Sequence, residues 1–244
     1  MDLLGQLTDL HIRVGRDDVE GARRVTATVA AAAAFAPALT AVVITGDIAE
    51  NGTGREYERA RELLAPLTMP IHVIAGNHDD PAALAAAFGT TTRWSARVGG
   101  LRLVGLDTTV PDSDAGALGA ERLAWIAETL AQDTAPTMLA MHHPPIETGV
   151  AAMDEIGLPA ADRAALAEVL AGTPQVRRII SGHVHRAVTG RIAGCPVTLS
   201  PSAERQLSLD LGGGDDVVFT SEPPAFMVHV AVDGDLASHV QEIT

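Results

Sequence analysis

The stretch "PIHVIAGNHDDP", residues 70–81, contains a short apolar run that ends abruptly in polar residues. The run at 71–75 is rich in β-branched residues and lies between turn-forming residues, which predicts a buried strand. Residues 76–79, "GNHD", follow it directly. A strand that only filled a core could end in any turn. The amide, imidazole and carboxylate groups therefore predict a functional site at the end of this strand.

Apolar runs of the same kind recur along the chain and alternate with helical patterns. The predicted strands are 3–8, 41–45, 71–75, 101–106, 137–141 and 178–181; the predicted helices are 19–35, 55–64, 81–88, 120–131 and 160–170. The apolar runs are nearly continuous, as in strands buried on both faces, and the strand–helix alternation predicts an α/β fold. From about residue 190 the pattern changes to short strands without a clear helix, which fits an antiparallel end to a mixed sheet. No linker divides the sequence, so we expect one domain over residues 1–244, with a β-rich C-terminal portion.

Composition and charge restrict the classes of function. The net charge of −14 repels polyanions and leaves no basic stripe for a nucleic-acid polymer, so any anionic substrate is expected to be small. The single cysteine, Cys195, excludes an internal disulfide framework and a Cys-rich zinc site. Residues 25–45 are uncharged over a length that would cross a bilayer, but Pro37 interrupts them, and we interpret them as a helix, a turn and a strand. With no targeting segment evident, we expect a cytoplasmic protein without a membrane partner.

Metal-ligand chemistry follows five of the predicted strands. In chain order these residues are Asp9 and His11, Asp47, Asn77 and His78, His142 and His143, and His183 and His185. In open α/β sheets, sites form at the carboxyl ends of the strands. If these ends converge, the Asp, His and Asn side chains share one cleft. Mixed ligands of this kind suit Mn, Fe, Zn or Co, and the absence of cysteine from these motifs argues against a thiolate site.

The spacing within two of these motifs supports a shared cleft. In extended backbone, residues i and i+2 point to the same face, so Asp9 and His11 are expected to bind one ion together. By the same argument, His183 and His185 can both reach this site. Glycines come just before three of the motifs, where they allow a tight turn or a close backbone approach; they are Gly46, Gly76 and Gly182.

The ordered set of motifs resembles the calcineurin-like metallophosphoesterase family, whose pattern is D-x-H, G-D, G-N-H-D/E, a strand-end His and G-H-x-H. The match runs from Asp9 to His185. The resemblance implies a four-layer α/β/β/α sandwich of two mixed sheets, with two metals at the strand ends. Within the family, "LDTTVP", "HHPPI" and "SGHVH" look similar to the class III cyclic-nucleotide phosphodiesterases and the related bacterial glycerophosphodiesterases.

This resemblance also implies a role for each residue of the motifs. One metal would be held by Asp9, His11, Asp47 and His185, and the other by Asp47, Asn77, His142 and His183, with Asp47 as the bridge. The implied cofactors are two divalent or trivalent transition-metal ions, with Mn and Fe favoured over Zn and Co. His78 would stay free of metal, contact the phosphate and protonate or stabilise the leaving oxygen. His143 and Asp79 would orient ligands or His78.

The implied function is metal-dependent hydrolysis of small phosphodiesters by a hydroxide held between the metals. Substrates would be 3′,5′-cyclic nucleotides, glycerophosphodiesters or several of these. A phosphomonoesterase, a nuclease and a non-catalytic scaffold remain as alternatives; the missing basic patch counts against the nuclease, and the complete ligand set counts against the scaffold. Members of the subfamily often form dimers through the later part of the chain, so a homodimer is a further expectation. For Arg205, both contact with a ligand phosphate and a solvated surface position remain open.

Overall fold

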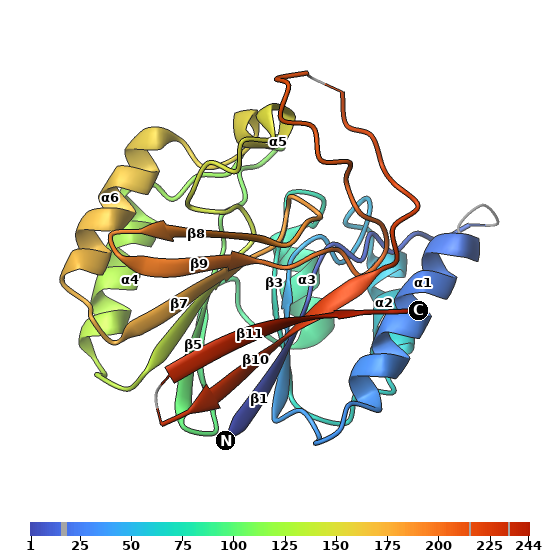
Figure 1. Ribbon diagram of the computed structural model, residues 1–244, viewed down its shortest axis with the longest axis horizontal. Helices are drawn as coiled ribbons and strands as arrows, with labels where there is room; N and C mark the ends of the chain where they lie inside the picture. Colours follow the sequence, from blue (N-terminus) through green and yellow to red (C-terminus); the bar gives the residue numbers. More distant parts are fainter. Residues whose placement is uncertain (16–18, 215, 234) are drawn as a thin grey trace.

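The computed structural model describes residues 1–15, 19–214, 216–233 and 235–244. Two β-sheets stack face to face, and helices cover the outer face of each sheet (Figure 1). The strand order is β11-β10-β1-β2-β3 in the first sheet and β4-β5-β6-β7-β9-β8 in the second. The predicted four-layer sandwich of two mixed sheets is therefore confirmed.

The first sheet contains three parallel strands that lead to the site. They are β1 (Asp2–Leu7), β2 (Ala41–Thr45) and β3 (Ile71–Ile74). Two strands from the end of the chain complete this sheet, because β10 (Ala225–Val232) pairs antiparallel with β1, and β11 (Asp235–Glu242) pairs antiparallel with β10.

The second sheet has a parallel centre and two antiparallel edges. The parallel neighbours are β5 (Leu101–Leu106), β6 (Thr137–Met141), β7 (Val176–Ser181) and β9 (Cys195–Leu199). The edges are β4 (Trp94–Val98) and β8 (Val188–Ile192). The expected antiparallel end to one sheet is thus wrong in part, because β9 is parallel to β7 and the last strands divide between both sheets.

In the described ranges, three helices pack on the side of the first sheet and three on the side of the second, where the short fifth helix lies at the rim (Figure 1). They are α1 (Val19–Ala33), α2 (Gly54–Leu64) and α3 (Pro81–Phe88), and then α4 (Gly119–Ala131), α5 (Ala151–Glu155) and α6 (Ala160–Ala171). Thr53 caps α2 through a capping box with Glu56, and Asp80 caps α3, which begins at Pro81. These side chains satisfy backbone N–H groups that a helix start leaves unpaired.

Apolar side chains form one core under each helical layer and a third core between the sheets. Val42 and Ile44 of β2 face the first helical layer, whereas Ala41 and Val43 face the second sheet. This arrangement confirms that the central strands are buried on both faces. The polar strand ends lie beyond these apolar segments, at one edge of the sandwich.

Two short elements were not predicted, and some boundaries differ by a few residues. Strand β4 is a five-residue edge strand that alternates between half-buried and exposed positions, and α5 is a single short turn of helix. Helix α1 ends at Ala33 rather than at Phe35. In the described ranges, no helix is long and apolar enough to cross a membrane.

Candidate metal centre

The seven predicted ligands all lie at the carboxyl ends of five strands. Asp9 and His11 follow β1, Asp47 follows β2, Asn77 follows β3, His142 follows β6, and His183 and His185 follow β7. The first three strands belong to one sheet and the last two to the other. The centre therefore lies where the edges of the two sheets meet.

Asp9, His11 and His185 form the first group of ligand atoms. The Nε2 atoms of His11 and His185 lie 3.0 Å apart. The Nε2 of His185 is also 3.6 Å from the Oδ1 of Asp9. One residue pair from the first sheet and one histidine from the second thus converge on one point.

The second group surrounds the amide oxygen of Asn77. Its Oδ1 lies 3.0 Å from the Nε2 of His142 and 3.2 Å from the Nδ1 of His183. Asp47 lies between the two groups, because its Oδ2 is 3.5 Å from the Nε2 of His142 and 3.6 Å from the Nε2 of His11. The structure therefore brings all seven residues together in two groups with one shared carboxylate.

Hydrogen bonds on the far side of three rings show that these residues fit metal ions. The Nδ1 of His142 donates to Thr45 O at 2.8 Å, and that of His185 donates to Arg205 O at 2.9 Å. The Nδ1 of His11 donates to the Glu50 carboxylate at 2.9 Å. In a neutral ring, the Nε2 then carries only a lone pair. The lone pairs of His11 and His185 face each other, which is repulsive unless a cation lies between them.

Burial sets the charge states of these groups. Burial, which outweighs the opposing charge of Asp47, holds the pKa of His142 and His183 below the ordinary value and lowers the pKa of His185 to about 3. These rings are therefore neutral, which is the form that binds metals. Burial and the nearby Asp47 raise the pKa of Asp9. Two close buried carboxylates are costly without a positive charge, so Asp9 and Asp47 also fit a cation pair.

The ligands take an unusual backbone conformation. Five of the seven have φ in the left-handed region; they are Asp9 (51°), His11 (44°), Asp47 (50°), His183 (72°) and His185 (51°). Such angles cost about 1–3 kcal/mol per residue and cluster at functional sites. Asp9 and His11 do converge, as expected, but the predicted cause, an extended backbone, is wrong. They converge because the chain turns sharply after β1, and the same turn after β7 sends His183 and His185 to different groups.

The predicted glycines permit close packing around the ligands. A Cβ on Gly76 would lie 2.1 Å from the Oδ1 of Asp47. Gly46 has φ +99°, and a Cβ there would lie 2.4 Å from the Nδ1 of His142. The expected close backbone approach is confirmed at both positions. It is also confirmed at Gly182, where a Cβ would overlap the hydroxyl of Thr8 and lie 2.9 Å from the Oδ2 of Asp9.

His78 lies beside both groups and forms, with His11 and Glu50, a further cluster of candidate ligand atoms. Its Nδ1 donates to Glu50 O at 2.9 Å, which leaves the Nε2 available to a substrate. Burial lowers its pKa, but the charge of Asp47 and the bond to Glu50 outweigh burial, so the pKa is raised. His78 and Asn77 both line a cleft of ≈ 260 Å³ over the centre, which also reaches Asp114.

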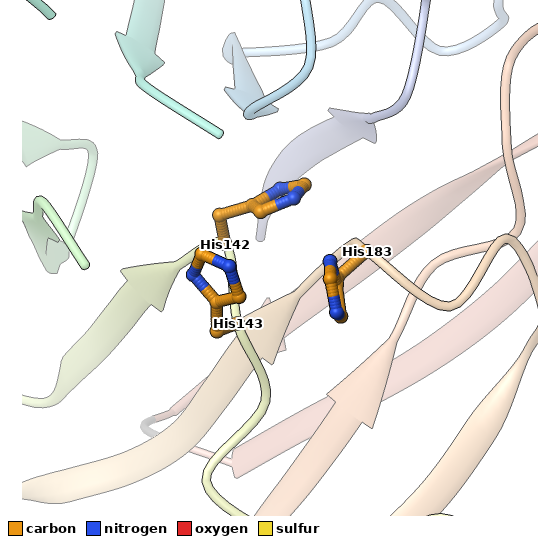
Figure 2. A group of neighbouring side chains, drawn as sticks. All are labelled: His142, His143 and His183. Atoms are coloured by element: carbon orange, nitrogen blue, oxygen red, sulfur yellow. The ribbon is translucent and has the colours of Figure 1, made fainter. Parts of the chain in front are cut away.

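His143 and Asp79 hold the loops around the ligands. Figure 2 shows His143 beside His142 and opposite His183, whose ring centroid lies 4.6 Å from that of His143. Both ring nitrogens of His143 have partners, because the Nε2 donates to Asp114 O at 3.0 Å and the Nδ1 bonds the Thr108 hydroxyl at 2.8 Å. His143 is thus saturated by hydrogen bonds and positions its neighbours.

Asp79 connects the loops after β2 and β3. Its carboxylate accepts hydrogen bonds from the backbone N–H groups of Ile48, Ala49 and Gly76 at 3.0–3.1 Å. Burial and the charge of Asp47 raise the pKa of Asp79 to about 6. These bonds fix Asp47 relative to Asn77.

The sequence did not predict the role of Glu50. Its carboxylate accepts from the Nδ1 of His11 and from Arg13, both at 2.9 Å. Burial opposes its ionisation, but the hydrogen bond from His11 and the charges of His11 and Arg13 lower its pKa to about 2. The only sequence signal was its position three residues after Asp47, which matches no motif.

Comparisons with known proteins agree with this geometry. A family model described as calcineurin-like phosphoesterase matches residues 3–187. The chain belongs to this family. It is 36% identical over 231 residues to a probable cyclic nucleotide phosphodiesterase of Synechococcus sp., covering 86% of this chain and 88% of that one. It is 33% identical over 198 residues to a probable glycerophosphodiester phosphodiesterase of Arcobacter nitrofigilis, covering 77% of this chain and 72% of that one.

Solved structures resemble the whole sandwich. A dimetal phosphatase from Danio rerio superposes with a TM-score of 0.72 at 14% identity, covering 100% of this chain and 96% of that one. A purple acid phosphatase from yellow lupin gives a TM-score of 0.68 at 15% identity, covering 99% of this chain and 51% of that one. At these identities the likeness concerns the fold alone.

Proposed function

We propose that this protein hydrolyses small phosphodiesters with two transition-metal ions bound by its seven strand-end ligands. The observation that carries the proposal is the position of Asp47, whose Oδ2 is nearly equidistant from His11 in one group and His142 in the other. Such a shared carboxylate is what a two-metal centre requires. The relatives named above as cyclic nucleotide and glycerophosphodiester phosphodiesterases support diesters as the substrates.

The bound metals would supply positive charge for the phosphate and would acidify water at neutral pH. Asp9, His11, Asp47 and His185 would hold one ion, and Asn77, His142 and His183 would hold the other with Asp47. The backbone carbonyls of Thr45 and Arg205 fix the tautomers that direct the Nε2 atoms of His142 and His185 inward. Because the ligands are held by this outer set of hydrogen bonds, the centre is preorganised.

His78 would give a proton to the leaving oxygen of the diester. Its Nδ1–H is bound to Glu50 O, so the proton would leave from the Nε2. Its raised pKa favours the protonated ring, and a positioned acid of this kind contributes about 10²–10⁴ to the rate. The backbone N–H of His78 also donates to the Oδ1 of Asp47 at 3.0 Å, which ties the acid to the bridging ligand.

The deciding experiment is a substrate panel for the purified protein loaded with Mn. The panel contains 3′,5′-cyclic AMP, glycerophosphoethanolamine, bis(p-nitrophenyl) phosphate and the monoester p-nitrophenyl phosphate. We expect metal-dependent turnover with a higher kcat/KM on the diesters than on the monoester. A preference for the monoester would identify a phosphomonoesterase. Metal binding without turnover of any member would identify a scaffold.

A further inference from the structure

Most of the cleft over the metal centre is bounded by ligands on one side and by apolar side chains on the other. The apolar side combines α5 with an arm, which we define as residues 207–214 and 216–220. This arm rises beside α5 at the rim of the molecule (Figure 1). The apolar residues that line the cleft are Met153, Ile156, Leu207, Val217 and Phe219.

Arg205 stacks on the aromatic ring of this wall. Its Cζ lies 3.9 Å from the ring centroid of Phe219, which is a cation–π contact. The same phenyl ring lies 5.6 Å, between centroids, from the ring of His185. The Arg205–Phe219 stack is therefore next to a proposed metal ligand.

The backbone of Arg205 is fixed against the metal centre. Its carbonyl accepts the Nδ1–H of His185, and its own N–H donates to the Oγ of Ser202 at 3.1 Å. The side chain is thus held at its base by hydrogen bonds and along its length by Phe219. An arginine ordered in this way is preorganised, unlike a solvated surface arginine.

The guanidinium keeps free donors beside the cleft. Its one carboxylate neighbour is Glu204, whose Oε2 lies 3.3 Å from the Nε of Arg205. In the described part of the chain, the two terminal nitrogens of Arg205 donate no hydrogen bond. Arg13 shows the contrast, because its terminal nitrogens donate to Glu50 and Glu204 at 2.9 and 3.0 Å.

The stack also separates two hollows. Glu50, Arg205 and Phe219 line both the metal cleft and a neighbouring cavity. The organic substituent of a phosphate held at the metals would thus have this pair within the same cleft. The half-buried guanidinium offers a flat face to a planar group in the cleft.

We propose that Arg205 and Phe219 form a stacking platform that binds the nucleobase of a cyclic nucleotide substrate. This inference rests on the proposed phosphodiesterase function and selects one of its substrate classes. A purine or pyrimidine ring stacks on the face of the guanidinium opposite Phe219. The aliphatic substituents of a glycerophosphodiester have no planar ring to stack. The platform therefore discriminates cyclic nucleotides from glycerophosphodiesters.

The test compares two variants, each of which removes a planar group. One keeps the positive charge, and the other keeps an apolar side chain. Arg205→Lys keeps the cation without the plane, and Phe219→Leu keeps an apolar side chain without the ring. In each Mn-loaded variant we expect the ratio of kcat/KM for 3′,5′-cyclic AMP to that for glycerophosphoethanolamine to fall about 5- to 100-fold, mainly through KM for the nucleotide. Phe219→Tyr restores a ring and should retain the ratio. So should Val218→Ala, which alters an exposed neighbour on the arm.

Two outcomes would overturn the platform. If Arg205→Lys keeps the wild-type ratio, the arginine acts only through its charge. If kcat/KM of either variant falls by the same factor on both substrates, the residue contributes to the phosphate chemistry that both share and does not bind the nucleobase.

Binding of adenosine 5′-monophosphate separates this inference from the proposed function. Calorimetry on Mn-loaded protein should show that Arg205→Lys and Phe219→Leu reduce the affinity for this nucleotide more than the affinity for glycerol 3-phosphate. If the wild type hydrolyses no diester, the phosphodiesterase proposal fails while this binding difference still decides the platform. Equal affinities of the variants and the wild type for the nucleotide would refute it.

Discussion

The Nε2 atoms of His11 and His185 lie 3.0 Å apart, and neither carries a hydrogen for the other while both rings are neutral. His11 gives its Nδ1–H to Glu50, and His185 gives its own to the carbonyl of Arg205. The two lone pairs converge on one point together with a carboxylate oxygen of Asp9. This convergence of electron pairs makes metal content the first quantity to measure.

We expect two transition-metal ions per chain in the wild type and loss of the pair in Asp47→Ala. Removing the bridge would leave two cations about 4 Å apart without a shared carboxylate. Their repulsion costs several kcal/mol at the effective dielectric of a partly buried site. Elemental analysis after dialysis measures the occupancy. Glu128→Ala, which removes an exposed carboxylate on α4, is the control. Full occupancy of both sites in Asp47→Ala would contradict the bridging role.

His78→Ala should keep both metals and lose activity selectively. The expected loss in turnover is about 10²–10⁴ on diesters with poor leaving groups, because an alkoxide needs a proton to depart. The loss should shrink with p-nitrophenyl leaving groups, which depart without protonation. A leaving-group series at saturating Mn gives the result, and an equal loss across the series would remove His78 from the acid role.

Asn77→Ala should behave differently although the two residues are adjacent. Asn77 contributes its amide oxygen to the second group, where His142 and His183 approach it. Its loss should weaken one metal and reduce turnover on every diester alike. The same series, combined with a Mn titration, separates the two variants. A dependence on the leaving group in Asn77→Ala would argue against its role as a ligand.

Gly76→Ala should weaken metal binding. The new methyl group would lie 2.1 Å from the Oδ1 of Asp47, so either the carboxylate or the backbone must move. Overpacking of this kind costs about 1–3 kcal/mol. A Mn titration and thermal unfolding measure both effects. Gly54→Ala, where a Cβ meets nothing within 4 Å, is the control. Unchanged Mn affinity in Gly76→Ala would show that the loop adapts freely.

His229 should make the protein sensitive to acid at a position away from the ligands. This buried ring bonds Ser238 at 2.7 Å and Gln6 at 2.9 Å. Burial, followed by the charge of Arg178, lowers its pKa to about 3. The neutral ring is favoured in the folded state, so its contribution is complete above about pH 6.5 and is lost as the pH falls from there towards about 3.

His229→Gln should therefore reduce the loss of unfolding free energy on acidification, by at most about 1.4 kcal/mol per pH unit. Denaturant unfolding of the metal-free wild type and the metal-free variant at several pH values in this window gives the slope of unfolding free energy against pH for each protein. Glu58→Gln at an exposed position of α2 is the control. An identical slope in the wild type and His229→Gln would show that the ring is protonated without cost.

The strands and the convergence of the seven predicted ligands followed from local sequence, because each motif directly continues an apolar run. Asp47 after β2 and Asn77 after β3 are examples, since a strand end and its polar residue are neighbours in the chain. Other features depend on distant contacts. The pairing of β10 with β1 joins opposite ends of the chain, and no local pattern indicates which sheet accepts it.

The same limit applies to the finer parts of the site. The contact between Arg205 and Phe219 depends on how the arm folds back, which sequence spacing does not fix. The sequence also did not predict the positive φ angles of Asp9 and His11, because the D-x-H spacing fits an extended strand equally well. Local patterns indicated which residues meet, and tertiary packing determined how.

Each group of ligands takes members from both sheets, since His185 meets Asp9 and His11, and Asn77 meets His142 and His183. A metal pair held in this way would cross-link the two sheets at one edge, as a disulfide does in a small secreted domain. Metal binding would then stabilise the packing of the two sheets against each other. Chelation should therefore loosen the molecule as a whole, and the rate of metal release should report how often the two sheets part at that edge.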